Sequence, residues 1–213
     1  MSLTLNQALE RVRRDLGDVD VANAVWTTDQ LQRHLEHALD ELSLAIPREQ
    51  KTTLTTTADS RDIDVSSLSD LLHIEAVEWP TGNYPPTYVR FSLWANTLTL
   101  LVSGAPAAVE NVDISWRQMH TIDPAGTTLP QWAEEILVRG AVGYAAQERS
   151  IEVANSINIG GPNTQRSYSQ LASDALNAFR QALRSHGDQG SLRTSSLYTP
   201  ATPLPSQSTD PGP

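Results

Sequence analysis

The chain has 213 residues and a formal net charge of −10 at pH 7. Hydrophobic residues make up 39% of it and charged residues 19%, which excludes a wholly disordered chain. It has no cysteine, which excludes disulfides, thiolate zinc sites and cysteine nucleophiles, and its acidity argues against a surface that binds nucleic-acid phosphates as a whole.

The N-terminal part of the chain predicts two amphipathic helices. Apolar residues at helical spacing predict a helix over 3–17, which Gly17 ends, and a second helix over 28–46, which Pro47 ends. Neither helix can bury its apolar stripe alone, so we expect both of them to pack against further helices.

The second helix begins with a capping box. We expect Thr27 to accept a hydrogen bond from the backbone N–H of Gln30, whose side chain reaches back to the backbone of Thr27. Trp26 and Leu31 occupy the two positions of a hydrophobic staple. These four residues therefore predict the start of the helix at residue 28.

Between residues 51 and 117 the apolar residues alternate with polar ones, which is typical of strands with one buried and one solvated face. The predicted strands are 52–57, 62–65, 73–79, 88–93, 96–102 and 112–117. They predict an antiparallel sheet, and the pattern leaves open whether this sheet stays open or folds into a sandwich.

Helical periodicity returns in the C-terminal part and predicts helices over 130–154 and 164–186. Gly140 and Gly143 lie within the first of them, where we expect another helix to pack closely. Residues 188–213 are rich in Ser, Thr and Pro, which predicts a flexible arm or one that folds only on a partner. The expected architecture is α+β: one domain over 1–187, with two N-terminal and two C-terminal helices, an inserted antiparallel sheet over 51–117, and a disordered or extended arm.

No enzymatic constellation stands out. His34 and His37 lie three apart on one helix, as in some metal sites, but no third ligand is recognisable nearby. The Gly-rich segment 160–164 lacks the Lys of a phosphate-binding loop. We therefore expect no catalytic residue, no metal and no cofactor. We expect the tryptophans of the sheet and of the third helix to supply packing area, and some of them to anchor interfaces; these are Trp79, Trp94, Trp116 and Trp132.

Acidic residues cluster in sequence around the first β-turn, at Asp59, Asp62, Asp64 and Asp70. We interpret them as solvated positions, because they alternate with apolar strand residues or cap turns. Carboxylates of this kind also bind divalent cations in nucleases. A metal-dependent nuclease that uses Asp59, Asp62 and Asp64 therefore remains an alternative.

The order helix, capped helix, antiparallel sheet, two long helices and tail is uncommon. With this order the chain resembles the head-to-tail adaptor proteins of tailed bacteriophages, also called head-completion or connector proteins. The resemblance covers roughly 3–185 and is carried by 26–31 with 34–42, then 74–80, 98–101 and 112–116, and finally 129–132, which opens the alanine-rich helix.

The resemblance implies a structural virion protein without catalytic residues. Such adaptors form a homo-oligomeric ring, a 12-mer, beneath the portal protein after DNA packaging, and they receive the next neck or tail protein. DNA passes through the channel without specific binding. The implied location is the head–tail junction of the virion, with the host cytoplasm during assembly. No membrane contact is expected, since no run of about twenty apolar residues and no secretory signal is visible.

The resemblance also implies that the C-terminal segment reaches the portal. Apolar residues of the arm that could dock there are Leu192, Leu197, Tyr198 and Leu204, while its prolines favour extended backbone. Another neck or tail component, such as a stopper, a terminator or a baseplate adaptor, remains an alternative.

Overall fold

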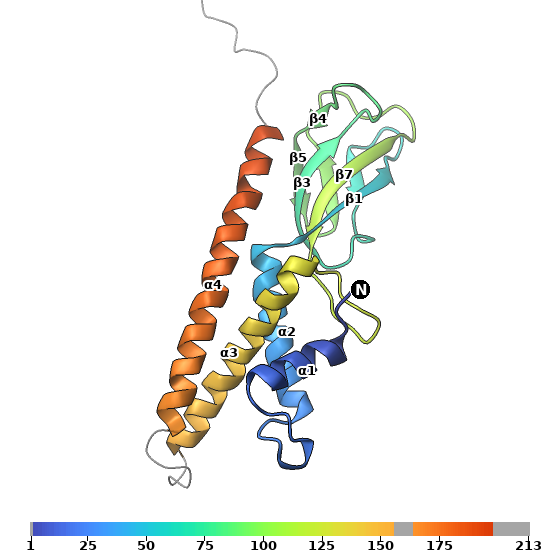
Figure 1. Ribbon diagram of the computed structural model, residues 1–213. Coiled ribbons are helices and arrows are strands. Elements are labelled where there is room, and N and C mark those ends of the chain that lie inside the picture. Colours follow the sequence, from blue (N-terminus) through green and yellow to red (C-terminus); the bar gives the residue numbers. More distant parts are fainter. Residues whose placement is uncertain (1, 156–163, 198–213) are drawn as a thin grey trace, which may run out of the picture.

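The computed structural model describes residues 2–155 and 164–197 and shows a helical bundle at one end and a β-region at the other (Figure 1). The helices are α1 (Leu5–Asp15), α2 (Thr28–Ala45), α3 (Gln131–Asn155) and α4 (Thr164–Leu197), with a short 3₁₀ helix at Val21–Asn23. The strands are β1 (Arg48–Thr55), β2 (Asp62–Asp64), β3 (Leu71–Glu78), β4 (Tyr88–Val89), β5 (Phe91–Trp94), β6 (Thr97–Leu100) and β7 (Asn111–Gln118). The expected α+β class, with a β-region inserted between two pairs of helices, is confirmed.

Helices α3 and α4 form a long antiparallel hairpin against which α2 packs (Figure 1). A Cβ atom added at Gly140 would lie 2.9 Å from the Ala38 Cβ of α2 and 2.9 Å from the Phe179 Cε2 of α4. At Gly143 it would lie 2.7 Å from the Leu176 Cγ. Glycine is thus needed where the three helices meet, as expected from its positions in the sequence.

The β-region is a small sandwich of two antiparallel sheets. The four-stranded sheet has the order β1-β7-β3-β4 and the three-stranded sheet the order β2-β6-β5. Their inner faces share one core, to which the three-stranded sheet contributes Ile63, Leu98 and Leu100 and the four-stranded sheet contributes Ile74, Val77, Val112, Ile114 and Trp116. The question that the sequence left open is therefore answered in favour of a sandwich.

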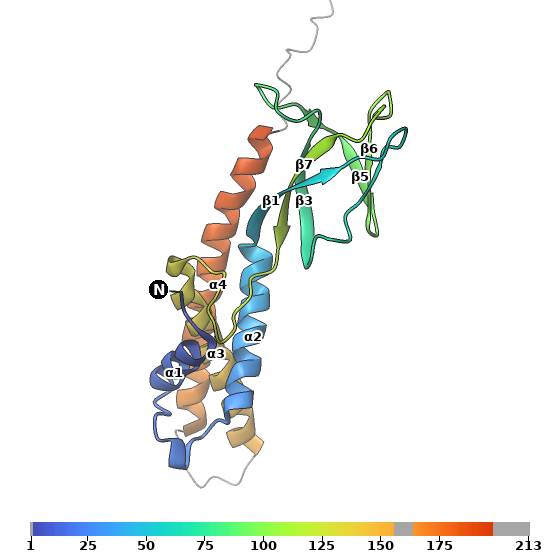
Figure 2. The same cartoon turned by 90° about the vertical axis from the view of Figure 1, so that its right-hand side faces the viewer.

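The sandwich has a proximal end, next to the bundle, and a distal end. Strand β1 starts three residues after α2, and its first residue, Arg48, pairs with Gln118, the last residue of β7. At the other end Thr55 pairs with Asn111. The loops 56–61, 79–87 and 101–110 consequently lie together at the distal end (Figure 2).

Two strand predictions need correction. Strand β1 begins at Arg48 and not at 52, because all of Arg48–Thr55 pairs with β7. The single strand predicted over 88–93 is two strands, β4 and β5, that belong to different sheets. Since both halves alternate in the same way, the sequence pattern does not reveal the crossing between sheets.

The predicted end of the last helix at 186 is also wrong. Helix α4 continues through Gly187 to Leu197, so the predicted arm begins as helix over 188–197. A glycine costs only about 1 kcal/mol relative to alanine in a helix interior, and extending an existing helix is far easier than nucleating one. Residues 198–213 lie outside the described residues.

Candidate interaction surface

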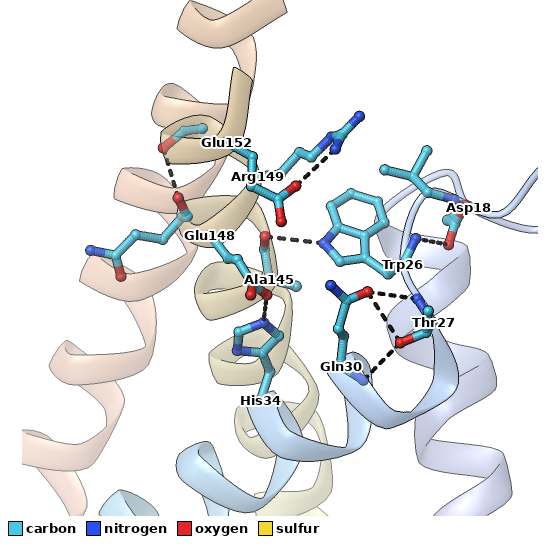
Figure 3. A network of polar contacts seen from close by, with 12 residues as sticks. Asp18, Trp26, Thr27, Gln30, His34, Ala145, Glu148, Arg149 and Glu152 are labelled. Atoms are coloured by element: carbon cyan, nitrogen blue, oxygen red, sulfur yellow. Dashed lines mark hydrogen bonds and ion pairs between the residues drawn. The ribbon is translucent and has the colours of Figure 1, made fainter. Parts of the chain in front are cut away.

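The loop between α1 and α2 is held by a buried carboxylate (Figure 3). Asp18 accepts hydrogen bonds from the backbone N–H groups of Val25, at 2.7 Å, and Trp26, at 3.3 Å, and pairs with Arg13 at 2.8 Å. The Trp26 indole Nε1 donates to the Ala145 carbonyl of α3 at 3.3 Å. These contacts fix the N-terminal helices to α3.

The capping residues predicted from the sequence lie next to this loop. The Gln30 backbone N–H donates to Thr27 Oγ1 at 3.2 Å, and the Thr27 backbone N–H donates to Gln30 Oε1 at 2.8 Å (Figure 3). Trp26 and Leu31 are both buried in the bundle core. The capping box is present, and these residues position α2 without offering groups to a ligand.

The two histidines of α2 face different partners. His34 Nε2 lies 2.5 Å from Glu148 Oε2 of α3, and Arg33 pairs with the other oxygen of Glu148 at 2.5 Å. Partial burial acts to raise the pKa of Glu148, but the hydrogen bonds from Arg33 and His34 outweigh it and lower the pKa. His37 instead stacks on Tyr144, with ring centroids 4.3 Å apart. The pair therefore ties α2 to α3.

The acidic residues around the first β-turn are not brought together either. Asp62 accepts a hydrogen bond from Thr99 Oγ1 at 2.6 Å, and Asp64 accepts one from the Ser66 backbone N–H at 2.8 Å, which lowers the pKa of Asp64. Asp59 and Asp70 occupy turns with φ of 59° and 52°. Within residues 2–155 and 164–197 no group of three His, Cys, Asp or Glu side chains is placed to hold a metal ion. Asp62 and Asp64 thus serve local contacts within the β-region.

Four of the exposed apolar side chains belong to the distal end of the sandwich. They are Tyr84, which is 98% exposed, with Tyr88, Leu101 and Val109, and we call them the distal surface. None of these four residues was predicted from the sequence as part of a contact surface. Tyr84 does offer a signal, since it stands between the turn formers Asn83 and Pro85, and an apolar side chain at a turn has no core beneath it.

Polar contacts brace the loops that carry the distal surface. The Arg61 guanidinium donates to the carbonyls of Val102, at 3.0 Å, and Ser103, at 2.8 Å. The Trp79 Nε1 donates to Glu110 Oε2 at 3.0 Å, and the Glu110 backbone N–H donates to Thr56 Oγ1 at 2.9 Å. These contacts tie the loops to one another, so the distal surface is carried by braced backbone.

The predicted arm residues fall into two groups. Leu192 and Leu197 belong to the last turns of α4, which packs on α3 and α2 in its first part. Tyr198 and Leu204 lie outside the described residues.

The comparisons with known proteins show similarity to solved structures alone. No protein-family model matches the chain, and no curated protein matches it. Among solved structures, one similar chain comes from the neck of an empty GTA particle computed with C6 symmetry; it is 13% identical, with a TM-score of 0.31, and the match covers 80% of this chain and 92% of that one. No helix among the described residues is long and apolar enough to cross a bilayer.

Proposed function

We propose that the protein is a structural component of the neck of a tailed-phage or phage-like particle, in which copies form a ring between the portal and the tail. The observation that carries this proposal is the order of elements in the structure. A capped helix pair, an inserted antiparallel β-region and a long helical hairpin follow one another, as in the adaptors that the chain resembles.

The polar clusters support a structural role. Asp18, His34 and Glu148 are all engaged in contacts that join helices to one another. Lys51 pairs across the four-stranded sheet with Asp113, at 2.8 Å, and Glu78, at 3.3 Å. These groups stabilise the fold, and we infer that the protein transforms no substrate.

Two parts of the molecule suit contacts with other neck components. The distal surface presents aromatic and aliphatic side chains on braced loops, and such side chains are common anchors of protein interfaces. The C-terminal arm starts where α4 leaves the bundle, and we propose that residues 198–213 reach the portal protein. The next neck or tail protein would bind the distal surface.

The acidity of the chain fits a channel for DNA. A ring through which duplex DNA moves should not hold phosphate groups, and a net charge of −10 favours repulsion over binding. We propose a ring of about twelve copies, in which DNA passes without specific contacts.

Truncation tests the portal contact. Protein ending at Leu197 is expected to fold and to lose binding to the portal protein encoded in the same genome, as measured by pull-down with full-length chain as reference. Undiminished binding would contradict the proposed arm. Stoichiometry then separates an adaptor from a stopper, terminator or baseplate protein: an adaptor forms a ring on purified portal, and the other components do not.

A further inference from the structure

Strand β1 borders the four-stranded sheet on one side. It is the outermost strand in the order β1-β7-β3-β4, and it lies on the side of the sheet away from α4 (Figure 1). All of its residues, Arg48–Thr55, pair with β7 without a register shift, whereas the pairing of β3 with β7 is shifted twice. The border of the sheet is therefore long and regular, and a border of this kind accepts a further strand.

The backbone hydrogen bonds of β1 alternate between its two sides. The Thr56 backbone N–H donates to the Glu110 carbonyl at 2.9 Å, in register with the ladder of β1 and β7. Because hydrogen-bonded pairs alternate along an antiparallel ladder, every second residue before Thr56 turns its backbone N–H and C=O groups toward β7. The residues between them turn these groups away from β7, and we call them the β1 edge; they are Lys51, Thr53 and Thr55.

The backbone of the β1 edge is unpaired in the described part of the chain. Over residues 2–155 and 164–197, no hydrogen bond reaches the backbone N–H or C=O groups of these three residues. The β1 edge also contains no proline, and its one charged side chain is Lys51. A lysine on an edge strand deters pairing by its charge. Here that charge is compensated, since Lys51 Nζ pairs with Asp113 at 2.8 Å and with Glu78 at 3.3 Å.

The β1 edge leads to the distal surface. Thr55 is the last residue of β1, and the Thr56 Oγ1 next to it donates to the Ala108 carbonyl at 3.1 Å. Val109, which belongs to the distal surface, follows Ala108 in the same loop and is exposed. A protein that binds the distal surface therefore comes close to the end of β1 and is placed to extend a segment along it.

No other part of this chain suits the β1 edge as an occupant. The other border strands among the described residues are β2, β4 and β5, with three, two and four residues against eight in β1. Pairing between the β1 strands of two copies would be twofold, and a twofold contact closes a dimer and does not build a ring. Residues 198–213 include five prolines, which have no N–H to donate.

We propose that the β1 edge binds an extended segment of the neck or tail protein that binds the distal surface. The segment adds a fifth strand to the four-stranded sheet through backbone hydrogen bonds to Lys51, Thr53 and Thr55. Its inward side chains lie next to Leu54, which packs against the sandwich core, so they are apolar, while its outward side chains lie next to Thr53 and are polar. This inference rests on the proposed function and names how the next component is held.

Amide hydrogen exchange tests the contact without altering the chain. In the free protein the amides of the β1 edge should exchange rapidly, whereas the amides between them, which bond to β7, should be protected. Each purified neck and tail protein encoded in the same genome is then added in turn. The one that binds is expected to slow exchange in the β1 edge by about tenfold or more and to leave the amides between nearly unchanged.

Two substitutions at one position sharpen the test. Thr53→Pro removes an N–H of the β1 edge and leaves the ladder with β7 intact, so the protein should fold and its affinity for the partner should drop about tenfold. Thr53→Val also removes the hydroxyl that bonds to Asp113 but keeps the N–H, and its affinity should stay within about twofold.

Two further variants complete the set. Thr55→Pro removes another N–H of the β1 edge and should weaken binding in the same way. Trp94→Ala is the control, because Trp94 is 79% exposed on the three-stranded sheet, and its affinity should not change. Biolayer interferometry measures the affinities, and thermal unfolding confirms that each variant is folded.

The outcomes separate this contact from the proposed function. Equal binding by Thr53→Pro and Thr53→Val proteins, or a bound partner that leaves exchange in the β1 edge unchanged, overturns the strand contact. Protection that appears in the chain alone and grows with its concentration overturns it in favour of a second copy. If no neck or tail protein binds while the chain forms a ring on the portal, the strand contact is wrong and the proposed function stands. If the strand contact is found but no ring forms on the portal, the adaptor function is wrong.

Discussion

The helical bundle and the β-sandwich have separate hydrophobic cores. The bundle core contains side chains of all four helices, among them Leu35, Leu137 and Phe179, while the sandwich core is formed by the two sheets, with Leu98 and Ile114 between them. The distal surface and helix α4 are therefore attached to different cores. A change in one core should therefore leave the surface on the other intact.

The joint between the two regions is polar and buried. The His120 backbone N–H donates to Ser43 Oγ of α2 at 3.0 Å, and Ser43 Oγ donates to the Leu39 carbonyl at 2.7 Å. The His120 ring lies 3.1 Å from Thr128 Oγ1, and burial lowers the pKa of His120. The ring is therefore neutral at pH 7, and no charge has to be buried where the sandwich meets the bundle.

The largest expected effect comes from the bundle core. Phe179 is fully buried between α2, α3 and α4, so Phe179→Ala should lower the free energy of unfolding by about 3–5 kcal/mol. Chemical denaturation measures this loss, and amide hydrogen exchange should show weaker protection in α3 and α4 while β6 and β7 keep theirs. Phe179→Leu, which leaves a smaller cavity, is the control. Equal loss of protection in both regions would refute the separation of the cores.

A smaller loss of stability should follow when a side chain is added at Gly140, where α3 packs closely on α2 and α4. Gly140→Ala improves intrinsic helix propensity by about 1 kcal/mol, yet its Cβ would lie only 2.9 Å from Ala38 and Phe179. We expect the cost of overpacking to exceed the gain in helix propensity. Thermal unfolding should then show that the free energy of unfolding falls by about 1–3 kcal/mol. Gly104→Ala, at a distal loop position where a Cβ meets nothing within 4 Å, should be nearly neutral. A stabilised Gly140→Ala protein would mean that the helices separate easily.

Local signals made the bundle readable from sequence. Gly140 and Gly143 stand in an apolar helical stripe, where a glycine without a packing role would only cost stability. The capping box at Thr27 and Gln30 needs residues three apart in one helix, so no distant part of the chain enters. The predicted bounds of an element were wrong where a contact with a part of the chain far away in sequence decides them. Strand β1 starts at Arg48 because Arg48 pairs with Gln118 at the end of β7.

The candidate surfaces were harder to predict for the same reason. The backbone groups of Lys51 and Thr53 face a free edge because β7 pairs with the other side of β1, and β7 lies far away in the sequence. The distal surface likewise assembles from two loops and strand β4, which antiparallel topology brings to one end of the sandwich. Sequence patterns show that a residue belongs to an alternating strand or caps a helix or turn. They do not show which strands become neighbours in the sheet.

The capping box provides a third and more local test. Thr27→Ala removes the acceptor for the Gln30 backbone N–H and should lower the free energy of unfolding by about 0.5–2 kcal/mol. Thr27→Ser keeps the acceptor and should retain most of that stability. Hydrogen exchange should locate the loss in the first turn of α2, and an unchanged protein would show that burial of Trp26 and Leu31 fixes the helix start alone.

The smallest change in the free energy of unfolding should come from the Lys51–Asp113 pair on the outer face of the four-stranded sheet, and it should depend on pH. Hydrogen bonds from Lys51 and then Thr53 lower the pKa of Asp113, and the bond to Asp113 is the main cause that raises the pKa of Lys51. A carboxyl with a lowered pKa stabilises the fold fully above its unfolded value of about 3.9 and loses that contribution as the pH falls through its folded value. The lysine contribution holds below about 10.4 and is lost only at higher pH.

Asp113→Asn should therefore cost about 0.5–1 kcal/mol at pH 7, because the pair is partly exposed to solvent, and the cost should shrink towards pH 2. Urea unfolding of both proteins at several pH values measures the difference. Asp40→Asn, the same change on the exposed face of α2, is the control and should be nearly neutral at pH 7. The free energies of unfolding of Asp113→Asn and of the natural sequence could instead differ by the same amount from pH 7 to pH 2. Asp113 would then act through its shape and its bond to Thr53, and its charge would not stabilise the sandwich surface.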